Sequence, residues 1–258
     1  MDKPDLLALY DRQMRMELRL PDLIYENTGS IIRDYSQDEG GYIDYAALDQ
    51  STADREIDAQ VAFFQSLGLP FTWKVFDHDR PADLRQRLQA RGFEIDQTDS
   101  LMVLDVHNAP EYYWSMALPD IVTRVTDAAG VEQIVRMEEE VWQAARDGLR
   151  KRLLRLLEGS PHQISLFTVP VEGRVVSAAW TVYYHPTRFA SLLGGSTLAA
   201  YRNRGYYTAL LVTRAREARE RGSRFLVVDA STMSAPILEK HGFQRLDFST
   251  RCRWSPEA

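Results

Sequence analysis

The stretch of sequence that most clearly suggests chemistry is residues 199–211, AAYRNRGYYTALL. Arg202 and Arg204 are followed by Gly205, and a run of helix-forming residues begins soon afterwards. The first amides of an α-helix have no intrahelical partner and lie at the positive end of the helix dipole. A preceding glycine lets the backbone turn sharply towards a ligand, and arginines supply further charge. These residues predict a cradle for phosphate groups, the alternative being an ordinary turn.

Tyr207 stands at a position of this cradle where a small residue is usual. Its backbone amide can donate a hydrogen bond whatever the side chain is. We therefore expect the ring to point away from the phosphates, towards the protein core or the edge of the ligand. A ring that filled the phosphate site would instead remove the main support for the cradle.

The 258-residue chain has a net charge of −6, but its charges are unevenly distributed. Residues 188–224 carry eight arginines and two glutamates, whereas residues 22–58 carry ten acidic residues and two arginines. One basic segment in an acidic chain favours a single anion site over a surface that binds nucleic acid. The solvated face of the helix in the basic segment is expected to consist of Arg214, Arg216, Glu217, Arg219 and Glu220.

The motifs that the sequence lacks exclude several classes of protein. No G-x-x-x-x-G-K-[ST] motif is present, which excludes a P-loop NTPase, and no G-x-G-x-x-G follows a predicted strand. The absence of a G-x-S-x-G elbow argues against an α/β-hydrolase. The five histidines are isolated and Cys252 is the single cysteine, so we expect no metal site and a reducing, cytoplasmic environment. No apolar segment has the length of a membrane span or signal peptide.

The hydrophobic pattern predicts alternating helices and strands in both halves of the chain. Ser51 and Asp54 resemble a capping box at the start of one helix. Expected helices cover 3–20, 51–67, 80–93, 129–143, 149–159, 208–222 and 234–243. Expected strands cover 22–36, 40–48, 71–76, 100–106, 121–127, 162–173, 174–185, 188–198, 224–231 and 244–254.

The two halves follow one plan of helix, glycine, strand, proline-led helix, Gly-Phe and strand. Gly68 and Phe93 of the first half correspond to Gly222 and Phe243 of the second. This similarity predicts a duplication, with one domain at 1–110 and another at 111–258. The alternative is that two common but unrelated units follow each other. The prolines and aromatic residues of 107–120 suggest a connection between the domains, or a loop packed across an interface.

Residues 120–258 resemble the GCN5-related N-acetyltransferase (GNAT) family, which transfers acyl groups from acyl-coenzyme A to amines. The family signature, Gln/Arg-x-x-Gly-x-Gly/Ala, reads Arg202-Asn203-Arg204-Gly205-Tyr206-Tyr207 here. FLVVDASTMSAPILEKHGF resembles the strand, turn, short helix and Gly-Phe that follow in the family. The resemblance implies an α+β fold, with a mixed, mostly antiparallel sheet flanked by helices and duplicated in this chain. It also implies acetyl-coenzyme A as the acyl donor.

The resemblance assigns residues to each part of the donor. Gly195, Ser196 and Thr197 would offer backbone groups to the pantetheine arm from a strand that splays from its neighbour. Ser231 lies where the family often has an asparagine that touches the pantetheine. The pyrophosphate is expected at Arg202, Asn203, Arg204, Gly205, Tyr206, Tyr207 and Thr208.

The sequence departs from the family at the general acid. A tyrosine is usual at position 238, where this chain has Leu238, so the hydroxyls of Ser231, Thr232 and Ser234 are the remaining candidates, together with water. The general base is unassigned, and the candidates by position are Tyr183, Tyr184, His185 and Asp229. His185 is more simply a surface turn residue and Asp229 a cap or turn former. Cys252 is expected to pack in the core rather than to carry an acyl group.

The first half lacks the arginine–glycine turn and is acidic where the second half is basic, so we interpret it as a degenerate copy without cofactor. Its acidic stretch favours a cationic, small-molecule amine as acceptor, the alternative being a solvated face. The implied reaction is direct attack of the amine on the thioester in a ternary complex. The alternative function is non-catalytic binding or sensing of acyl-coenzyme A. The sequence is compatible with a monomer or a homodimer. We expect neither nucleic acid nor a membrane as a partner.

Overall fold

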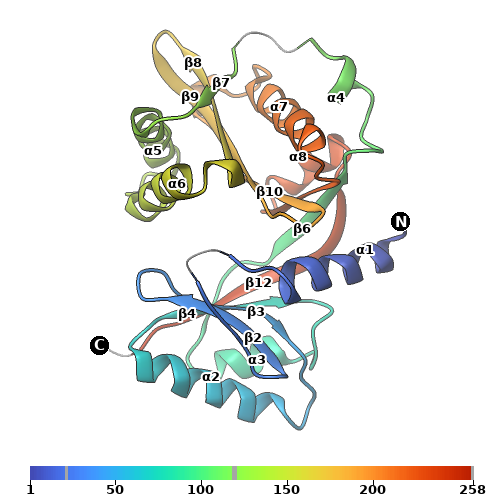
Figure 1. The fold of residues 1–258 in the computed structure, drawn as a ribbon, viewed down its shortest axis with the longest axis vertical. Helices are drawn as coiled ribbons and strands as arrows, with labels where there is room; N and C mark the ends of the chain where they lie inside the picture. The colour runs from blue at the N-terminus through green and yellow to red at the C-terminus, as the bar shows by residue number, and fades with distance from the viewer. Residues whose placement is uncertain (21–22, 118–120, 257–258) are drawn as a thin grey trace. The chain divides into compact units, whose positions relative to one another are not determined.

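The computed structural model describes residues 1–20, 23–117 and 121–256. These residues form two compact units, which are described separately (Figure 1). Unit 1 comprises Met1–Met102 and Asp229–Ala258, and unit 2 comprises Val103–Val228. Among the described residues, no helix combines the length and apolar character needed to cross a membrane. The predicted connection at 107–120 includes three positions that lie outside the described residues.

The units differ from the predicted domains at the C-terminal end of the chain. The sequence pattern places residues 229–258 in the second domain, but they belong to unit 1. The reason is strand pairing: β12 (Gln244–Trp254) runs antiparallel to β4 (Phe71–Phe76), with Ser249 opposite Phe76 and Trp254 opposite Phe71. β12 also pairs with β5 (Glu94–Ile95). The last strand of the chain is therefore part of the sheet of unit 1.

Unit 1 is a mixed sheet with α1 on one face and α2 and α3 on the other (Figure 1). β1 and β2, and β2 and β3, are antiparallel, whereas β3 and β4 are parallel. Its core includes Ile43, Phe64, Trp73 and Cys252, which confirms that Cys252 packs inside. The further elements are α1 (Lys3–Tyr10), the π-helical turn η1 (Asp11–Met16), β1 (Ile24–Asn27), β2 (Ile31–Ser36), β3 (Gly40–Ala46), α2 (Ala53–Leu67), α3 (Leu84–Gln89) and α8 (Ala235–Lys240).

Unit 2 has α5 and α6 on one face of its sheet and α7 on the other (Figure 1). The predicted hairpin of β8 and β9 is confirmed, and its turn residues Glu172 and Gly173 both have positive φ. The elements are α4 (Tyr112–Ser115), β7 (Thr123–Val125), α5 (Ala128–Trp142), α6 (Asp147–Gly159), β8 (Ile164–Val171), β9 (Arg174–Tyr183), β10 (Phe189–Thr197) and α7 (Tyr206–Glu220). The chain passes between the units within β6 (Asp99–Asp105) and β11 (Phe225–Ala230).

The two units repeat one internal plan, in agreement with the predicted duplication. In unit 1, β2 and β3 are antiparallel, α2 follows, and β4 pairs parallel to β3. In unit 2, β9 and β10 are antiparallel, α7 follows, and β11 pairs parallel to β10. Each plan also has a register shift in its antiparallel pair, which leaves Asp44 as the extra residue in β3 and Gly195 as the extra residue in β10.

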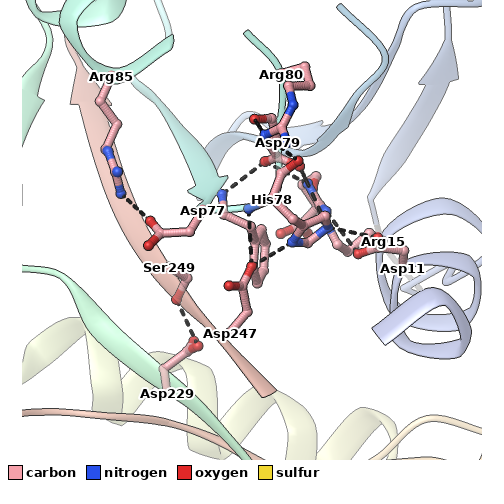
Figure 2. Close-up of polar contacts among 12 residues, drawn as sticks. Asp11, Arg15, Asp77, His78, Asp79, Arg80, Arg85, Asp229, Asp247 and Ser249 are labelled. Atoms are coloured by element: carbon pink, nitrogen blue, oxygen red, sulfur yellow. Dashed lines mark hydrogen bonds and ion pairs between the residues drawn. The ribbon is translucent and has the colours of Figure 1, made fainter. Parts of the chain in front are cut away.

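A network of charged side chains connects η1 to the turn after β4 in unit 1 (Figure 2). His78 lies between two carboxylates: its Nδ1 is 2.5 Å from Oδ2 of Asp247, and its Nε2 is 2.8 Å from Oδ2 of Asp11. Arg15 donates from Nη2 to both carboxylate oxygens of Asp79, at 2.8 and 2.9 Å. Burial by itself lowers the pKa of His78, but the bonds to Asp11 and Asp247 outweigh it and raise the pKa to about 9.

This network predicts a pH dependence of stability that the variant His78→Gln removes. Because the folded-state pKa of His78 is raised to about 9, its contribution is complete below the unfolded pKa of about 6.5 and is lost as the pH rises through 9. We expect the difference in free energy of unfolding between wild type and His78→Gln to fall by about 2 kcal/mol between pH 6 and pH 9.5. Urea unfolding at a series of pH values measures it. His185→Gln, at an exposed turn, is the control, and a difference independent of pH would contradict the prediction.

Candidate functional site

The central feature of unit 2 is a β-bulge in β10. β10 pairs with β9 through Thr197, but the register shifts between Gly194, opposite Ala179, and Ser196, opposite Ala178. Gly195 is therefore the extra residue of the bulge, outside the ladder. β10 pairs with β11 over Phe189–Ser191, so its second half lies beyond that ladder on the β11 side. This local geometry resembles the splayed strand expected for the pantetheine arm.

The bulge can be made here only by glycine, for two reasons. Gly194 and Gly195 have φ angles of +69° and +84°, which strain any residue with a Cβ. A Cβ at Gly194 would lie 2.4 Å from Cζ3 of Trp180, and one at Gly195 would lie 3.2 Å from Cε2 of Tyr207. The Tyr207 ring is therefore packed beside the bulge of β10.

The turn before α7 has the backbone conformation that exposes helix amides. Gly205 is the N-cap at φ +81° and provides no side-chain cap, and Asn203 also has positive φ, at 62°. The first hydrogen bond within α7 runs from the amide of Ala209 to the carbonyl of Gly205, at 2.9 Å. The amides of residues 206–208 thus precede the helical ladder, as in anion sites at helix N-termini. Tyr206 packs against the core, while Asn203 and Gly205 are exposed.

The two arginines of the turn are exposed and are held by backbone carbonyls. Nε of Arg202 donates to the carbonyl of Thr197 at 3.2 Å, which ties the turn to the end of β10. Nη2 of Arg204 donates to the carbonyl of Ala200 at 3.1 Å. Donors of both guanidinium groups remain for an anion, because each of these bonds uses one N–H of several. The structure thus brings Thr197, Arg202 and Arg204 together.

The corresponding turn of unit 1 is closed by its own carboxylate. Oδ1 of Asp49 accepts hydrogen bonds from the amides of Ser51 and Thr52, at 2.8 and 2.9 Å, and from both hydroxyls. These bonds to Ser51 and Thr52 lower the pKa of Asp49 to about 2. The capping box predicted at Ser51 and Asp54 is therefore wrong, since the N-cap is Thr52 without a side-chain cap and Asp49 takes the amides. An anion already lies where a phosphate would bind.

Much of the basic segment is used inside unit 2 rather than exposed. Arg214 and Glu217 are buried, so the predicted solvated face is wrong for both. Arg216 donates to the carbonyls of Tyr113 and Met116, at 2.6 and 2.5 Å. α7 lies under α4 and against β8, β9 and β10, which leaves little of its surface for solvent.

Arg214 is a buried cation next to the bulge. Its guanidinium donates to the carbonyls of Leu210, Trp180 and Leu193, at 3.3 to 3.4 Å. Nη2 lies 3.9 Å from the position of a Cβ at Gly195. Within the described residues no carboxylate pairs with it, and burial lowers its pKa. Buried charges usually have a charged partner, so a ligand that brought negative charge to this end of β10 would be favoured.

Glu138 is a buried carboxylate on the other side of β10, and sequence reasoning missed it. It is 4% exposed, Nε1 of Trp142 donates to its Oε2 at 2.8 Å, and its Oε1 has no hydrogen-bond partner among the described residues. Burial raises its pKa, while Ser196, Trp142 and Arg146 oppose the rise. A signal was present: Glu138 falls on the apolar stripe of α5 with Val131, Ile134 and Val135.

The predicted catalytic hydroxyls belong to unit 1 and lie in the turn before α8. Oγ of Ser231 lies 3.1 Å from Oγ of Ser234, and the amide of Ser234 donates to Oγ of Ser231 at 3.3 Å. Thr232 is exposed. Leu238 is 2% exposed in the core, so the family's tyrosine position holds an apolar packing residue. Whether any of these residues meets the donor stays a prediction.

The predicted candidates for the general base differ in their surroundings: Asp229 is paired, His185 is exposed, and Tyr183 is buried. Tyr184 is partly buried against the core. Asp229 accepts from Lys74 at 2.8 Å and from Arg251 at 3.0 Å; burial alone would raise its pKa, but these cations lower it. Burial raises the pKa of Tyr183, which disfavours its ionised form. His185 is exposed at the turn before β10, in agreement with a surface role.

No group of three or more metal-ligating side chains is found among the described residues. The buried thiol of Cys252 has its pKa raised by burial to about 12, so it is a poor nucleophile at neutral pH.

Comparison with known proteins identifies the fold. No protein-family model matches the chain, and no curated protein matches it. A GCN5-related N-acetyltransferase from Kribbella flavida aligns with a TM-score of 0.66 at 12% identity, covering 98% of this chain and 95% of that one. A putative acetyltransferase of the GNAT family from Novosphingobium aromaticivorans aligns at 0.60 and 13% identity over 100% of both chains. A tandem GNAT protein from the clavulanic acid biosynthesis pathway aligns at 0.60 and 12% identity, over 99% and 95%. The chain therefore has the GNAT fold, as predicted.

The geometry of the bulge predicts an unusually costly glycine substitution. Gly194→Ala places a Cβ 2.4 Å from Trp180 at a φ of +69°, whereas Gly173→Ala, at φ +79°, meets no atom within 4 Å. We expect Gly173→Ala to cost about 1 kcal/mol for its positive φ, and Gly194→Ala to cost a further 1–3 kcal/mol, roughly, for overpacking. Urea unfolding of both variants measures the difference. Equal losses of stability would contradict the steric role of Trp180.

Proposed function

We propose that this chain is a member of the GNAT family and acts as an acetyl-coenzyme A-dependent N-acetyltransferase on a small-molecule amine. The observation that carries the proposal is the turn before α7, where Gly205 leaves the first helix amides uncapped and Arg202 and Arg204 are exposed. This turn directly follows the bulged strand β10. The shared fold with proteins described as acetyltransferases supports the same function. The single, buried Cys252 favours a reducing compartment, the cytoplasm.

The residues of the turn would hold the pyrophosphate. The amides of residues 206–208 lie at the positive end of the dipole of α7 and can bond phosphate oxygens together. Arg202 and Arg204 can add charge-assisted bonds, for which guanidinium geometry is well suited. Gly195, Ser196 and Thr197 would pair with the pantetheine arm as with a neighbouring strand. The second half of β10 lies beyond its ladder with β11, so its backbone groups on that side are outside this ladder.

The bound donor and amine would react in a ternary complex. The bulge orients backbone groups of β10 away from the ladder, where an amide can stabilise the oxyanion that forms as the amine attacks the thioester carbonyl. Holding both reactants in line supplies a large part of the rate by proximity. Since Leu238 carries no proton, the thiolate would take its proton from the adduct nitrogen or from water.

We further propose that unit 1 binds no coenzyme A. The carboxylate of Asp49 already accepts the amides of Ser51 and Thr52 before α2, and it would repel a phosphate. Asp49 lies three residues before the N-cap Thr52, and Arg202 lies three residues before the N-cap Gly205. The two copies therefore place opposite charges at the same position of the same turn.

The alternative function is a protein that binds or senses acyl-coenzyme A without catalysis, for which the apolar Leu238 is the specific observation. Steady release of free thiol from acetyl-coenzyme A with a set of amines would rule this alternative out. Binding of coenzyme A without any thiol release would favour it.

The equivalence of the two turns gives a direct test of the phosphate site. Arg202→Asp copies the carboxylate of unit 1 into unit 2, where it can accept the turn's amides and repel the pyrophosphate. We expect Arg202→Ala to weaken coenzyme A binding by about ten-fold, and Arg202→Asp by about a hundred-fold or more. Isothermal titration calorimetry with coenzyme A measures both.

Arg152→Asp is the matched control, because Arg152 is exposed on α6 and the substitution makes the same change in net charge. It should bind coenzyme A as the wild type does. Failure of the wild type to bind coenzyme A would overturn the proposed function. Equal binding by Arg202→Asp and Arg152→Asp would overturn the assignment of the turn.

A further inference from the structure

The bulge of β10 contains two glycines that cannot hold their own conformation. Gly194 and Gly195 follow each other with positive φ, and neither has a side chain that restricts its backbone. Glycine loses more conformational freedom on folding than any other residue. The backbone of the bulge must therefore be held by its neighbours. Trp180 lies beside it on β9, and Tyr207 and Arg214 lie beside it on α7.

Arg214 bonds the backbone of both strands just before the register shifts. Leu193 and Trp180 are directly opposite each other, and the shift comes after the next pair. Nη1 of Arg214 donates to both of their carbonyl oxygens, at 3.3 and 3.4 Å. Its Nε donates to the carbonyl of Leu210 on α7 at 3.3 Å. A carbonyl oxygen has two lone pairs, so it can accept from Arg214 and still take part in the ladder. One guanidinium thus ties β9, β10 and α7 together.

A buried cation is a costly way to fill this position. Arg214 is 2% exposed. Glu217, the buried carboxylate on the same helix, is paired with Arg124 and Arg221 instead. Burying a guanidinium without a countercharge costs far more free energy than filling the same space with an apolar side chain. The cation is explained if its hydrogen bonds do something that an apolar residue could not do.

The copy of this plan in unit 1 has no such cation. The N-caps of α2 and α7 are Thr52 and Gly205. The ninth residue after each N-cap is Val61 in α2 and Arg214 in α7, and Val61 packs against the core of unit 1. The extra residue of β3 is Asp44, which has a Cβ and no positive φ. The cation is therefore present in the copy whose bulge is made of glycine and absent from the copy whose bulge is not.

We propose that Arg214 is a positioning residue for acyl transfer, which holds the bulge of β10 in the conformation that turns a backbone amide towards the thioester carbonyl. This inference rests on the proposed N-acetyltransferase function. Arg214 touches neither reactant and moves no proton. Its bonds to Leu193 and Trp180 fix the point from which the two glycines turn. Without them the glycines can adopt other conformations, and the amide that stabilises the oxyanion is misplaced for part of the time.

The first test separates the reaction from binding of the donor. Arg214→Met keeps the length of the side chain but loses its charge and its three hydrogen bonds. We expect kcat for thiol release from acetyl-coenzyme A, with the amine that reacts fastest in the wild type, to fall by roughly thirty-fold or more. We expect the Kd of coenzyme A to stay within about three-fold of the wild type, because the pyrophosphate turn is bonded independently of Arg214. Calorimetry measures the Kd.

Arg216→Met is the matched control. Arg216 is on the same helix and donates to the carbonyls of Tyr113 and Met116, so the substitution removes the same charge and similar bonds, but none on β9 or β10. Both variants are assayed at a temperature at which circular dichroism shows them folded. The kcat of Arg216→Met should stay within about three-fold of the wild type. Equal losses of kcat in both variants, or no loss in Arg214→Met, would overturn the positioning role.

Arg214→Lys separates the hydrogen bonds from the charge. An ammonium group keeps the charge, but as a compact point donor it cannot bond the carbonyls of both strands and that of Leu210 together. We expect its kcat to lie closer to that of Arg214→Met than to that of the wild type. A wild-type kcat would show that charge alone is sufficient and would overturn the proposal. The lysine variant also decides the question if Arg214→Met does not fold.

Hydrogen exchange observes the bulge without any reaction. In the absence of ligand, we expect the amides of residues 193–197 to exchange faster by about ten-fold or more in Arg214→Met and Arg214→Lys, and at the wild-type rate in Arg216→Met. Mass spectrometry of peptides that cover these residues measures it. A wild type that binds no coenzyme A or releases no thiol refutes the proposed function. Unchanged exchange at 193–197 in the Arg214 variants refutes the role of Arg214, whatever the activity.

Discussion

The bulge at Gly195 is the constraint on which the arrangement of unit 2 depends. A β-strand presents alternate residues to opposite faces, and one extra residue re-aims everything that follows it. Here the change brings Gly195 against Tyr207 of α7 and Ser196 towards Glu138 of α5. The positive φ angles and the ring of Trp180 permit only glycine at the point of change. Two glycines therefore decide which helix each of the next residues meets.

The two copies of the duplicated plan carry opposite charges at the same turn. Both copies have an antiparallel pair with an extra residue, a helix, and a parallel strand. The extra residue is Gly195 in unit 2 and Asp44 in unit 1, and the residue three before the N-cap is Arg202 in unit 2 and Asp49 in unit 1. Helix N-termini attract negative charge in either case. In unit 1 the carboxylate of Asp49 supplies that charge from within the chain.

The order of elements and the glycine-led turn before α7 were predictable because they depend on local signals. Glycine and proline mark turns, and the hairpin at Glu172-Gly173 is one example. The pairing of β12 with β4 was not predictable, because no local pattern encodes the register of strands so far apart in the chain. The burial of Arg214 was missed because charge on a helix normally indicates solvent. The burial of Arg214 is explained by the position of α7 between α4 and the sheet.

The apolar side chain of Leu238 cannot act as the general acid, but protonation of the leaving thiolate is not the most costly step of the reaction. At pH 7, freeing the lone pair of an alkylamine with an ordinary pKa of about 10.4 costs about 5 kcal/mol. Releasing a thiolate from a thiol with a pKa of about 8.5 costs about 2 kcal/mol. The larger barrier is therefore the proton on the amine, so the loss of an acid at position 238 removes the less valuable of the two groups.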